Sequence, residues 1–175
     1  MEKYDPKQRT LRLCVTAMFM AMNVALSSFG VPVPGGHLYL NDIIIDTAAI
    51  LLDPFAAFMV GGVGAFLGDL FFYPTPMFVS LVTHGLQAVV ISLLARQGRR
   101  EKPQLWAIIG LVLGCIIMVT GYSLGRAYIY ATPEYAIIKL PYQIAQAVIG
   151  AAAAPLLCWK CRLMDIYKRW LDRNK

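Results

Sequence analysis

The chain has 175 residues, of which 58% are hydrophobic and only 15% are charged, and its mean hydropathy is +0.59. A soluble domain is roughly 45–50% apolar and about 25% charged. A domain of this length could not hide so much apolar surface in its own core. The composition therefore excludes an ordinary soluble domain and predicts an integral membrane protein.

Six apolar stretches follow one another along the chain, separated by polar residues or by prolines and glycines. A membrane-spanning helix needs roughly 20 mostly apolar residues. The predicted spans are about 11–30, 42–52, 54–72, 77–95, 105–128 and 135–157. The second is short, so we expect it to be tilted or to begin inside the preceding loop. The expected fold class is an all-α integral membrane protein, a six-transmembrane-helix bundle that forms a single domain over residues 1–175.

The basic residues fall on one side of this arrangement. Fourteen of the 16 lie before the first span, between the fourth and fifth spans, or after the sixth: Lys3, Lys7, Arg9, Arg12, Arg96, Arg99, Arg100, Lys102, Lys160, Arg162, Lys168, Arg169, Arg173 and Lys175. Short cytoplasmic loops carry an excess of Lys and Arg, so both termini are predicted to be cytoplasmic.

The basic residues that give the net charge of +6 are thus expected to face anionic lipid and the cytoplasm, and they do not indicate binding to nucleic acid. We expect a multi-pass protein of the bacterial plasma membrane. Residues 160–175, in which apolar and basic residues are mixed, are expected to form an amphipathic helix on the cytoplasmic leaflet.

Motifs for catalysis do not occur in the sequence. It contains no phosphate-binding Gly-Lys-Ser/Thr, no HExxH and no nucleophile elbow. Cys158 and Cys161 have CxxC spacing, but no second pair stands nearby to complete a zinc site. We therefore expect no cofactor, no metal and no enzyme activity, and any ATP hydrolysis would belong to other subunits.

Polar and aromatic residues lie toward the predicted outer side of the last three spans. Polar groups at membrane depth usually face a bundle interior or a cavity. Stacking surfaces with a few hydrogen-bonding groups suit a small polar aromatic ligand. The residues that we expect to contact such a ligand on these spans are His84, Gln87, Tyr122, Arg126, Lys139, Tyr142, Gln143 and Gln146.

Two alternatives stay open for these residues. The tyrosines could form an interfacial belt, and Arg126 and Lys139 could extend toward lipid headgroups. Asp46 and Asp69 are ambiguous, since either could contact a ligand or stabilise helix packing.

Small residues form a ridge on the first span. Ala17, Ala21 and Ala25 recur every four residues and fall on one face of a helix. Small residues at this spacing let two membrane helices approach closely. The ridge therefore predicts either a partner-docking face or a contact inside the bundle.

The order of these motifs resembles the substrate-binding S components of energy-coupling factor (ECF) vitamin transporters, in the riboflavin, pyridoxine and hydroxymethylpyrimidine branch. The resemblance rests on the alanine ridge, on GGHLYLNDIIIDTAAILLDPFAAFMVGGVGAFLGDL and on LPYQIAQAVIG, and it covers about residues 11–157. One position departs from the pattern, because His84-Gly85 stands where Lys-Gly is expected. The resemblance therefore leaves the ligand open.

This resemblance implies an importer component that binds a vitamin or vitamin precursor from outside with high affinity. Its partners would be a transmembrane coupling protein, dedicated or shared, and two cytoplasmic ATPase subunits. The alanine ridge would be the docking surface for the coupling protein. Loop 31–41 would be a lid, with His37, Leu38 and Tyr39 closing over the ligand.

Two other functions compete with this interpretation. A self-sufficient secondary transporter would need a continuous polar path with titratable groups in its inner half, where this chain is mainly apolar. A membrane scaffold would bind no small molecule, so a vitamin that co-purifies would separate the two interpretations.

Overall fold

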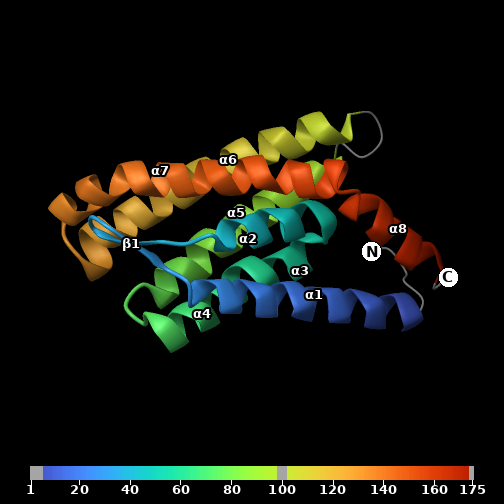
Figure 1. Ribbon diagram of the computed structural model, residues 1–175, viewed down its shortest axis with the longest axis horizontal. Coiled ribbons are helices and arrows are strands. Elements are labelled where there is room, and N and C mark those ends of the chain that lie inside the picture. The colour runs from blue at the N-terminus through green and yellow to red at the C-terminus, as the bar shows by residue number, and fades with distance from the viewer. Residues whose placement is uncertain (1–5, 98–101, 174–175) are drawn as a thin grey trace.

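The computed structural model describes residues 6–97 and 102–173. Lys3, Arg99, Arg100 and Lys175, which contribute to the predicted charge pattern, lie outside the described residues. The described chain is mostly helical, and its long helices run side by side along one elongated bundle (Figure 1).

Short π-helical segments, labelled η, continue or interrupt some of the helices. Their bounds, in chain order, are α1 (Pro6–Ser27), α2 (Asn41–Leu51), α3 (Pro54–Phe58), η1 (Met59–Val63), α4 (Gly64–Phe72), α5 (Met77–Gln97), α6 (Pro103–Gly125), η3 (Arg126–Tyr130), α7 (Pro133–Pro155), η4 (Leu156–Lys160) and α8 (Leu163–Arg173). From α1 to α7, with α3–η1–α4 taken as one run, successive helices alternate in direction along the bundle (Figure 1).

Five of these helical runs are long and apolar enough to cross a membrane. They are Pro6–Ser27, Pro54–Phe72, Met77–Gln97, Pro103–Tyr130 and Pro133–Lys160. They correspond to the predicted first, third, fourth, fifth and sixth spans. The structure therefore contains the long apolar helices that a multi-pass membrane protein requires.

The predicted second span differs from the other five. It is α2, an 11-residue helix in which all residues but Ile43 are buried. At 1.5 Å per residue α2 is about 16 Å long, well short of a hydrocarbon core of about 30 Å. It packs against α1, α5 and α7, so its apolar character reflects burial in protein. Whether α2 counts as a sixth span stays a prediction.

Loop 31–41, the predicted lid, contains a small β-hairpin. Strands β1 (Val31–Val33) and β2 (Gly36–Leu38) pair antiparallel, with Val31 opposite Leu38. The turn depends on Gly35 and Gly36, whose φ angles of 80° and 137° are rarely adopted by other residues. The hairpin lies at one end of the bundle (Figure 1).

The glycines of the third predicted span let two neighbouring helices approach closely. A Cβ on Gly61 would lie 2.7 Å from the His84 carbonyl oxygen of α5, and one on Gly64 would lie 2.8 Å from Asn23 Nδ2 of α1. Asn23 in turn donates from Nδ2 to the Val60 carbonyl oxygen at 2.7 Å. The continuous run α3–η1–α4 is thus held between α1 and α5.

The start of α1 and the end of α8 lie together at the end of the bundle away from the hairpin (Figure 1). Gln8 Nε2 donates to the Leu171 carbonyl oxygen at 3.0 Å, and Arg12 forms an ion pair with Asp53. Within the predicted tail 160–175, α8 is a helix over Leu163–Arg173 with Tyr167 buried against the core, and the position of the tail on the cytoplasmic leaflet stays a prediction. Which end of the bundle faces the cytoplasm stays a prediction.

The alanine ridge points away from the bundle. Ala17, Ala21 and Ala25 are all exposed, whereas Phe19 and Asn23 of the same helix are buried. Of the two roles left open for the ridge, the structure excludes packing inside this chain.

Candidate functional site

A cavity of about 390 Å³ lies at the hairpin end of the bundle. The hairpin, α2, α4, α5, α6, η3 and α7 all contribute to its walls. Its lining residues include Ser27, Gly35, Gly36, His37, Tyr39, Asn41, Asp69, Tyr73, His84, Met118, Tyr122, Arg126, Tyr130, Tyr135, Lys139, Gln143 and Gln146. Ligand pockets for small molecules are typically about 300–1,000 Å³, so the cavity has the volume of a small-molecule site.

Eight of the ten residues expected to contact a ligand line this cavity. They are His37, Tyr39, His84, Tyr122, Arg126, Lys139, Gln143 and Gln146. Gln87 and Tyr142 are not among the lining residues. Gln87 is buried behind His84, and Tyr142 lies at the edge of the buried stripe of α7 that carries its neighbour Gln143. Leu38, expected in the lid, is also not a lining residue.

The hairpin is tied to α7 across the mouth of the cavity. Lys139 Nζ donates to the His37 carbonyl oxygen, and the Tyr39 backbone N–H donates to Gln146 Oε1 at 3.1 Å. Burial and the nearby Asp69 carboxylate raise the pKa of Tyr39, so its phenol keeps its proton at neutral pH. The hairpin thus covers the cavity through its backbone and presents neutral Tyr39 to it.

One wall of the cavity contains a short hydrogen-bonded chain. Tyr122 donates its hydroxyl proton to Ser80 Oγ at 2.5 Å, and Ser80 donates to Asp69 Oδ2. The Tyr122 ring also packs edge-on against His84, with 5.1 Å between ring centroids. Of the two ambiguous carboxylates, Asp69 is therefore the one that lines the cavity.

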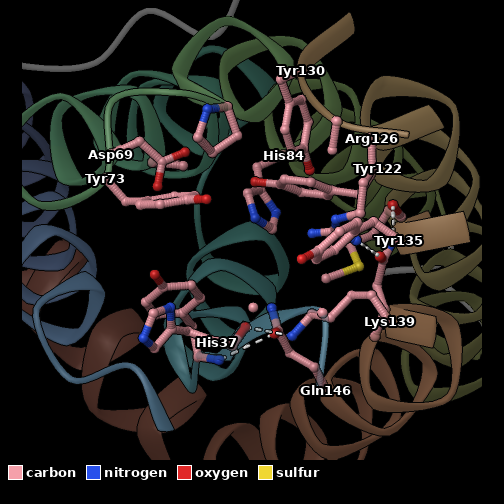
Figure 2. A pocket seen from close by; sticks show the side chains of 18 of the residues that line it. His37, Asp69, Tyr73, His84, Tyr122, Arg126, Tyr130, Tyr135, Lys139 and Gln146 are labelled. Atoms are coloured by element: carbon pink, nitrogen blue, oxygen red, sulfur yellow. Dashed lines mark hydrogen bonds between the residues drawn. The ribbon is translucent and has the colours of Figure 1, made fainter. Parts of the chain in front are cut away.

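The cavity has walls of opposite charge. Asp69 and Tyr73 lie on one side of it, and Arg126 and Lys139 lie on the other (Figure 2). Arg126 Nη1 donates to Gln143 Oε1 at 2.9 Å, which fixes the guanidinium against α7. A bound molecule would thus meet an acceptor wall and a donor wall.

A pair of carboxylates is buried beneath the cavity. Asp42 and Asp46 of α2 are each 1% exposed. Gln87 Nε2 lies 3.2 Å from Asp42 Oδ1 and 2.9 Å from Asp46 Oδ1, and Gln146 Nε2 donates to Asp42 Oδ2 at 2.6 Å. Asp46 therefore stabilises the packing of α2 against α5 and does not line the cavity. Among the described residues, no group of three or more His, Cys, Asp or Glu could hold a metal ion.

The lining residues that were not among the ten expected contacts include Asn41, Tyr73, Tyr130 and Tyr135. Asn41 Oδ1 and the Tyr130 hydroxyl are buried without a hydrogen-bond partner in the described part of the chain. A buried polar atom without a partner is costly, so these atoms are available to a ligand. The sequence carried one signal for Asn41, which directly precedes Asp42 at the start of the predicted second span.

The chain is similar in sequence to a transporter family and to two known proteins. Residues 7–162 match the family model described as the ECF-type riboflavin transporter, S component. The chain is 32% identical over 151 residues to the thiamine precursor transporter HmpT of Lactococcus lactis subsp. cremoris strain MG1363, covering 83% of this chain and 84% of that protein. It is 33% identical over 132 residues to an uncharacterised protein of Pyrococcus woesei, covering 74% of this chain and 86% of that one.

A solved structure shares the fold. An S component of a bacterial ECF transporter superposes with a TM-score of 0.65 at 19% identity, covering 88% of this chain and 96% of that one. The resemblance first based on the alanine ridge and the Gly-rich motifs is thus confirmed. The chain belongs to the ECF S-component family, as a multi-pass protein of the bacterial plasma membrane that serves transport and not catalysis.

Proposed function

We propose that this S component binds a B vitamin or vitamin precursor from outside the cell with high affinity. It then delivers that ligand inward with a transmembrane coupling protein and two ATPase subunits. The ligand belongs to the riboflavin, pyridoxine or hydroxymethylpyrimidine class of small polar ring compounds.

The cavity beneath the hairpin is the observation that carries this proposal. Tyrosine rings supply stacking surface on several sides, while Asn41 Oδ1 and the Tyr130 hydroxyl lack partners in the described chain. Rings with hydrogen-bonding edges satisfy both features, because they stack on tyrosines and pair with isolated polar atoms. Riboflavin, for which the family is named, and the thiamine precursor, for which the relative HmpT is named, fall in the same chemical class.

The proposal also includes an orientation in the membrane. In a six-span bundle the hairpin end faces outward and both termini face the cytoplasm. Among the described residues, Arg9 and Arg12 lie near the start of α1, Arg96 lies near the end of α5 and Lys102 directly precedes α6. These helix ends lie away from the hairpin (Figure 1), which supports this orientation under the positive-inside rule. The exposed ridge Ala17–Ala21–Ala25 on α1 is then the docking surface for the coupling protein.

Small molecules released from the purified, denatured protein provide the first test. We expect mass spectrometry to find one vitamin in near-stoichiometric amount, and thermal-shift screening of B vitamins to identify the same compound. An empty protein that no vitamin stabilises would contradict the proposal and favour a scaffold.

Two variants test the assigned site. His84→Ala and Gln146→Ala should each weaken binding of that vitamin by tenfold or more, since each leaves buried polar groups unpaired, a loss of about 1–3 kcal/mol. Tyr128→Ala is the matched control, because Tyr128 is 79% exposed on η3 and does not line the cavity. Wild-type affinity in both site variants would show that the ligand binds elsewhere.

A further inference from the structure

One hydrogen bond beneath the hairpin has an unambiguous direction. A backbone N–H can only donate, so the Tyr39 amide, 3.1 Å from Gln146, identifies the side-chain atom that it meets as the oxygen Oε1. The other amide atom of Gln146 must then be the nitrogen. Gln146 therefore donates from Nε2 to Asp42 Oδ2 at 2.6 Å.

The orientation of the Gln87 side-chain amide follows from the atoms around it. One end of this amide lies 2.9 Å from Asp46 Oδ1 and 3.2 Å from Asp42 Oδ1. The NH₂ group has two protons, one for each carboxylate oxygen. In the reverse orientation Oε1 would face both oxygens, and any carboxylate oxygen without a proton would repel it. The nitrogen of Gln87 thus faces α2, and its oxygen faces His84.

His84 is the last residue of this chain of hydrogen bonds. Its Nδ1 lies 2.8 Å from Gln87 Oε1 and 3.6 Å from Asp42 Oδ1, so both neighbours of Nδ1 are acceptors. Nδ1 must carry a proton to bond with either. In a neutral imidazole only one nitrogen carries a proton, so Nε2 is left with a lone pair.

The charged and titratable groups around His84 come from every wall. Asp42 and Asp46 face it from α2, Asp69 from α4 and Tyr122 from α6, while Arg126 and Lys139 line the same cavity from η3 and α7. His84 itself is 2% exposed, and its ring is held edge-on by Tyr122. The ring therefore cannot turn without breaking the bond to Gln87.

We infer that His84 is fixed as the Nδ1–H tautomer and offers Nε2 to the cavity as a hydrogen-bond acceptor. The ligand must then donate an N–H or O–H proton at this point. This specificity rests on the proposed function. The resemblance leads one to expect lysine at this position, and lysine can only donate a hydrogen bond. A lysine would need an acceptor atom on the ligand, whereas this histidine needs a donor.

The tautomer can be measured without any ligand. The chain contains two histidines, so ¹⁵N-histidine labelling and a His37→Gln variant leave His84 as the only labelled ring. We expect long-range ¹H–¹⁵N correlation spectra in detergent micelles to show a protonated Nδ1 and an unprotonated Nε2. A protonated Nε2, alone or in a doubly protonated ring, would overturn the inference.

Gln87→Leu tests the cause of this preference. Leucine removes the acceptor at Nδ1, so the His84 ring should lose its single Nδ1–H state and show a changed nitrogen spectrum. An unchanged spectrum in a folded Gln87→Leu protein would overturn the role of Gln87. If this variant does not fold, the wild-type spectrum still decides the tautomer.

Ligand binding tests the specificity, with riboflavin and hydroxymethylpyrimidine as probes. His84→Gln keeps a side-chain acceptor, whereas His84→Lys offers only donors. For the probe that binds the wild type, we expect His84→Lys to lose about tenfold or more in affinity, and more than His84→Gln loses. Equal or tighter binding by His84→Lys would overturn the inference. The Nδ1–H tautomer in a protein that binds neither probe nor any other vitamin would support the assignment and overturn only the proposed function.

Discussion

Gly150 of α7 packs directly on Asp42 of α2, so closely that a Cβ on the glycine would lie 2.7 Å from the Asp42 Cβ and 3.1 Å from its carbonyl carbon. This contact brings α7 against the short buried helix. It also places Gln146, one turn earlier on α7, within hydrogen-bond distance of the Asp42 carboxylate. The absence of a side chain at Gly150 thus allows α7 and α2 to pack closely enough for the Gln146–Asp42 hydrogen bond to form beneath the cavity.

Gly150→Ala should therefore destabilise the protein. In an unconstrained helix, alanine is favoured over glycine by about 1 kcal/mol, but here the added methyl group must displace backbone, which typically costs about 1–3 kcal/mol. We expect a lower Tm in detergent. Ala152→Gly, at an exposed position of α7, measures the helix-propensity effect alone. A Tm for Gly150→Ala at or above the wild-type value would show that α2 and α7 are not in close contact.

Lys139→Met should loosen the hairpin. This change removes the charged donor to the His37 carbonyl oxygen, and hydrogen bonds to charged groups contribute about 1.5–3 kcal/mol. Amides of Gly36–Leu38 should exchange about tenfold faster in hydrogen–deuterium exchange followed by mass spectrometry. Ile138→Met, at a 49% exposed position next to it, should leave exchange unchanged. Equal protection in Lys139→Met would mean that other contacts hold the hairpin.

Ala21→Leu should block assembly with the coupling module while leaving the fold intact. Surface substitutions usually change stability by less than about 0.5 kcal/mol, but a larger side chain on a small-residue ridge keeps a partner helix at a distance. We expect loss of co-purification with the coupling protein and ATPases, with vitamin binding retained. Val148→Leu, exposed on α7, is the control. If Ala17→Leu/Ala21→Leu still assembles fully, the docking surface lies elsewhere.

The purified chain alone should not carry its ligand across a bilayer. Beneath the carboxylate pair, residues Ala48, Ala49, Ile50, Leu51 and Leu52 are each at most 2% exposed, and they leave a polar molecule no hydrogen-bonding path. Proteoliposomes should bind riboflavin or hydroxymethylpyrimidine without moving it inside, as measured by radiolabel flux. Flux above that of empty liposomes would favour a self-sufficient transporter.

The sequence predicts the long helices well because lipid imposes a clear condition on them. A stretch of about 20 apolar residues is hard to mistake, and all five long spans occur where they were expected. The same rule does not decide the surroundings of α2, since a helix buried entirely in protein is as apolar as one in lipid but need not be as long. Hydropathy therefore locates α2 and its short length of 11 residues, but it does not reveal that protein surrounds this helix.

The site could be predicted in outline because its residues recur at helical spacing. Lys139, Gln143 and Gln146 share a face of α7 and all line the cavity. Tyr142 belongs to the same pattern but lies at its edge, and the sequence gives no measure of where a face ends. Gln87 likewise shares a face with His84, yet it bonds to Asp46 of α2, a contact that depends on tertiary structure.

The buried apolar segment 48–52 of α2 and its C-terminal end also affects whether ions can leak across the membrane through this chain. A charge needs a polar or hydrated route to cross a low-dielectric interior, and each proton crossing the membrane would dissipate about 2.3 kcal/mol for every 100 mV. Residues Ala48–Leu52 are apolar and buried, so this segment offers an ion no polar or hydrated route. If the proposed function holds, copies of this chain that are not assembled with ATPase subunits would therefore not discharge the proton-motive force.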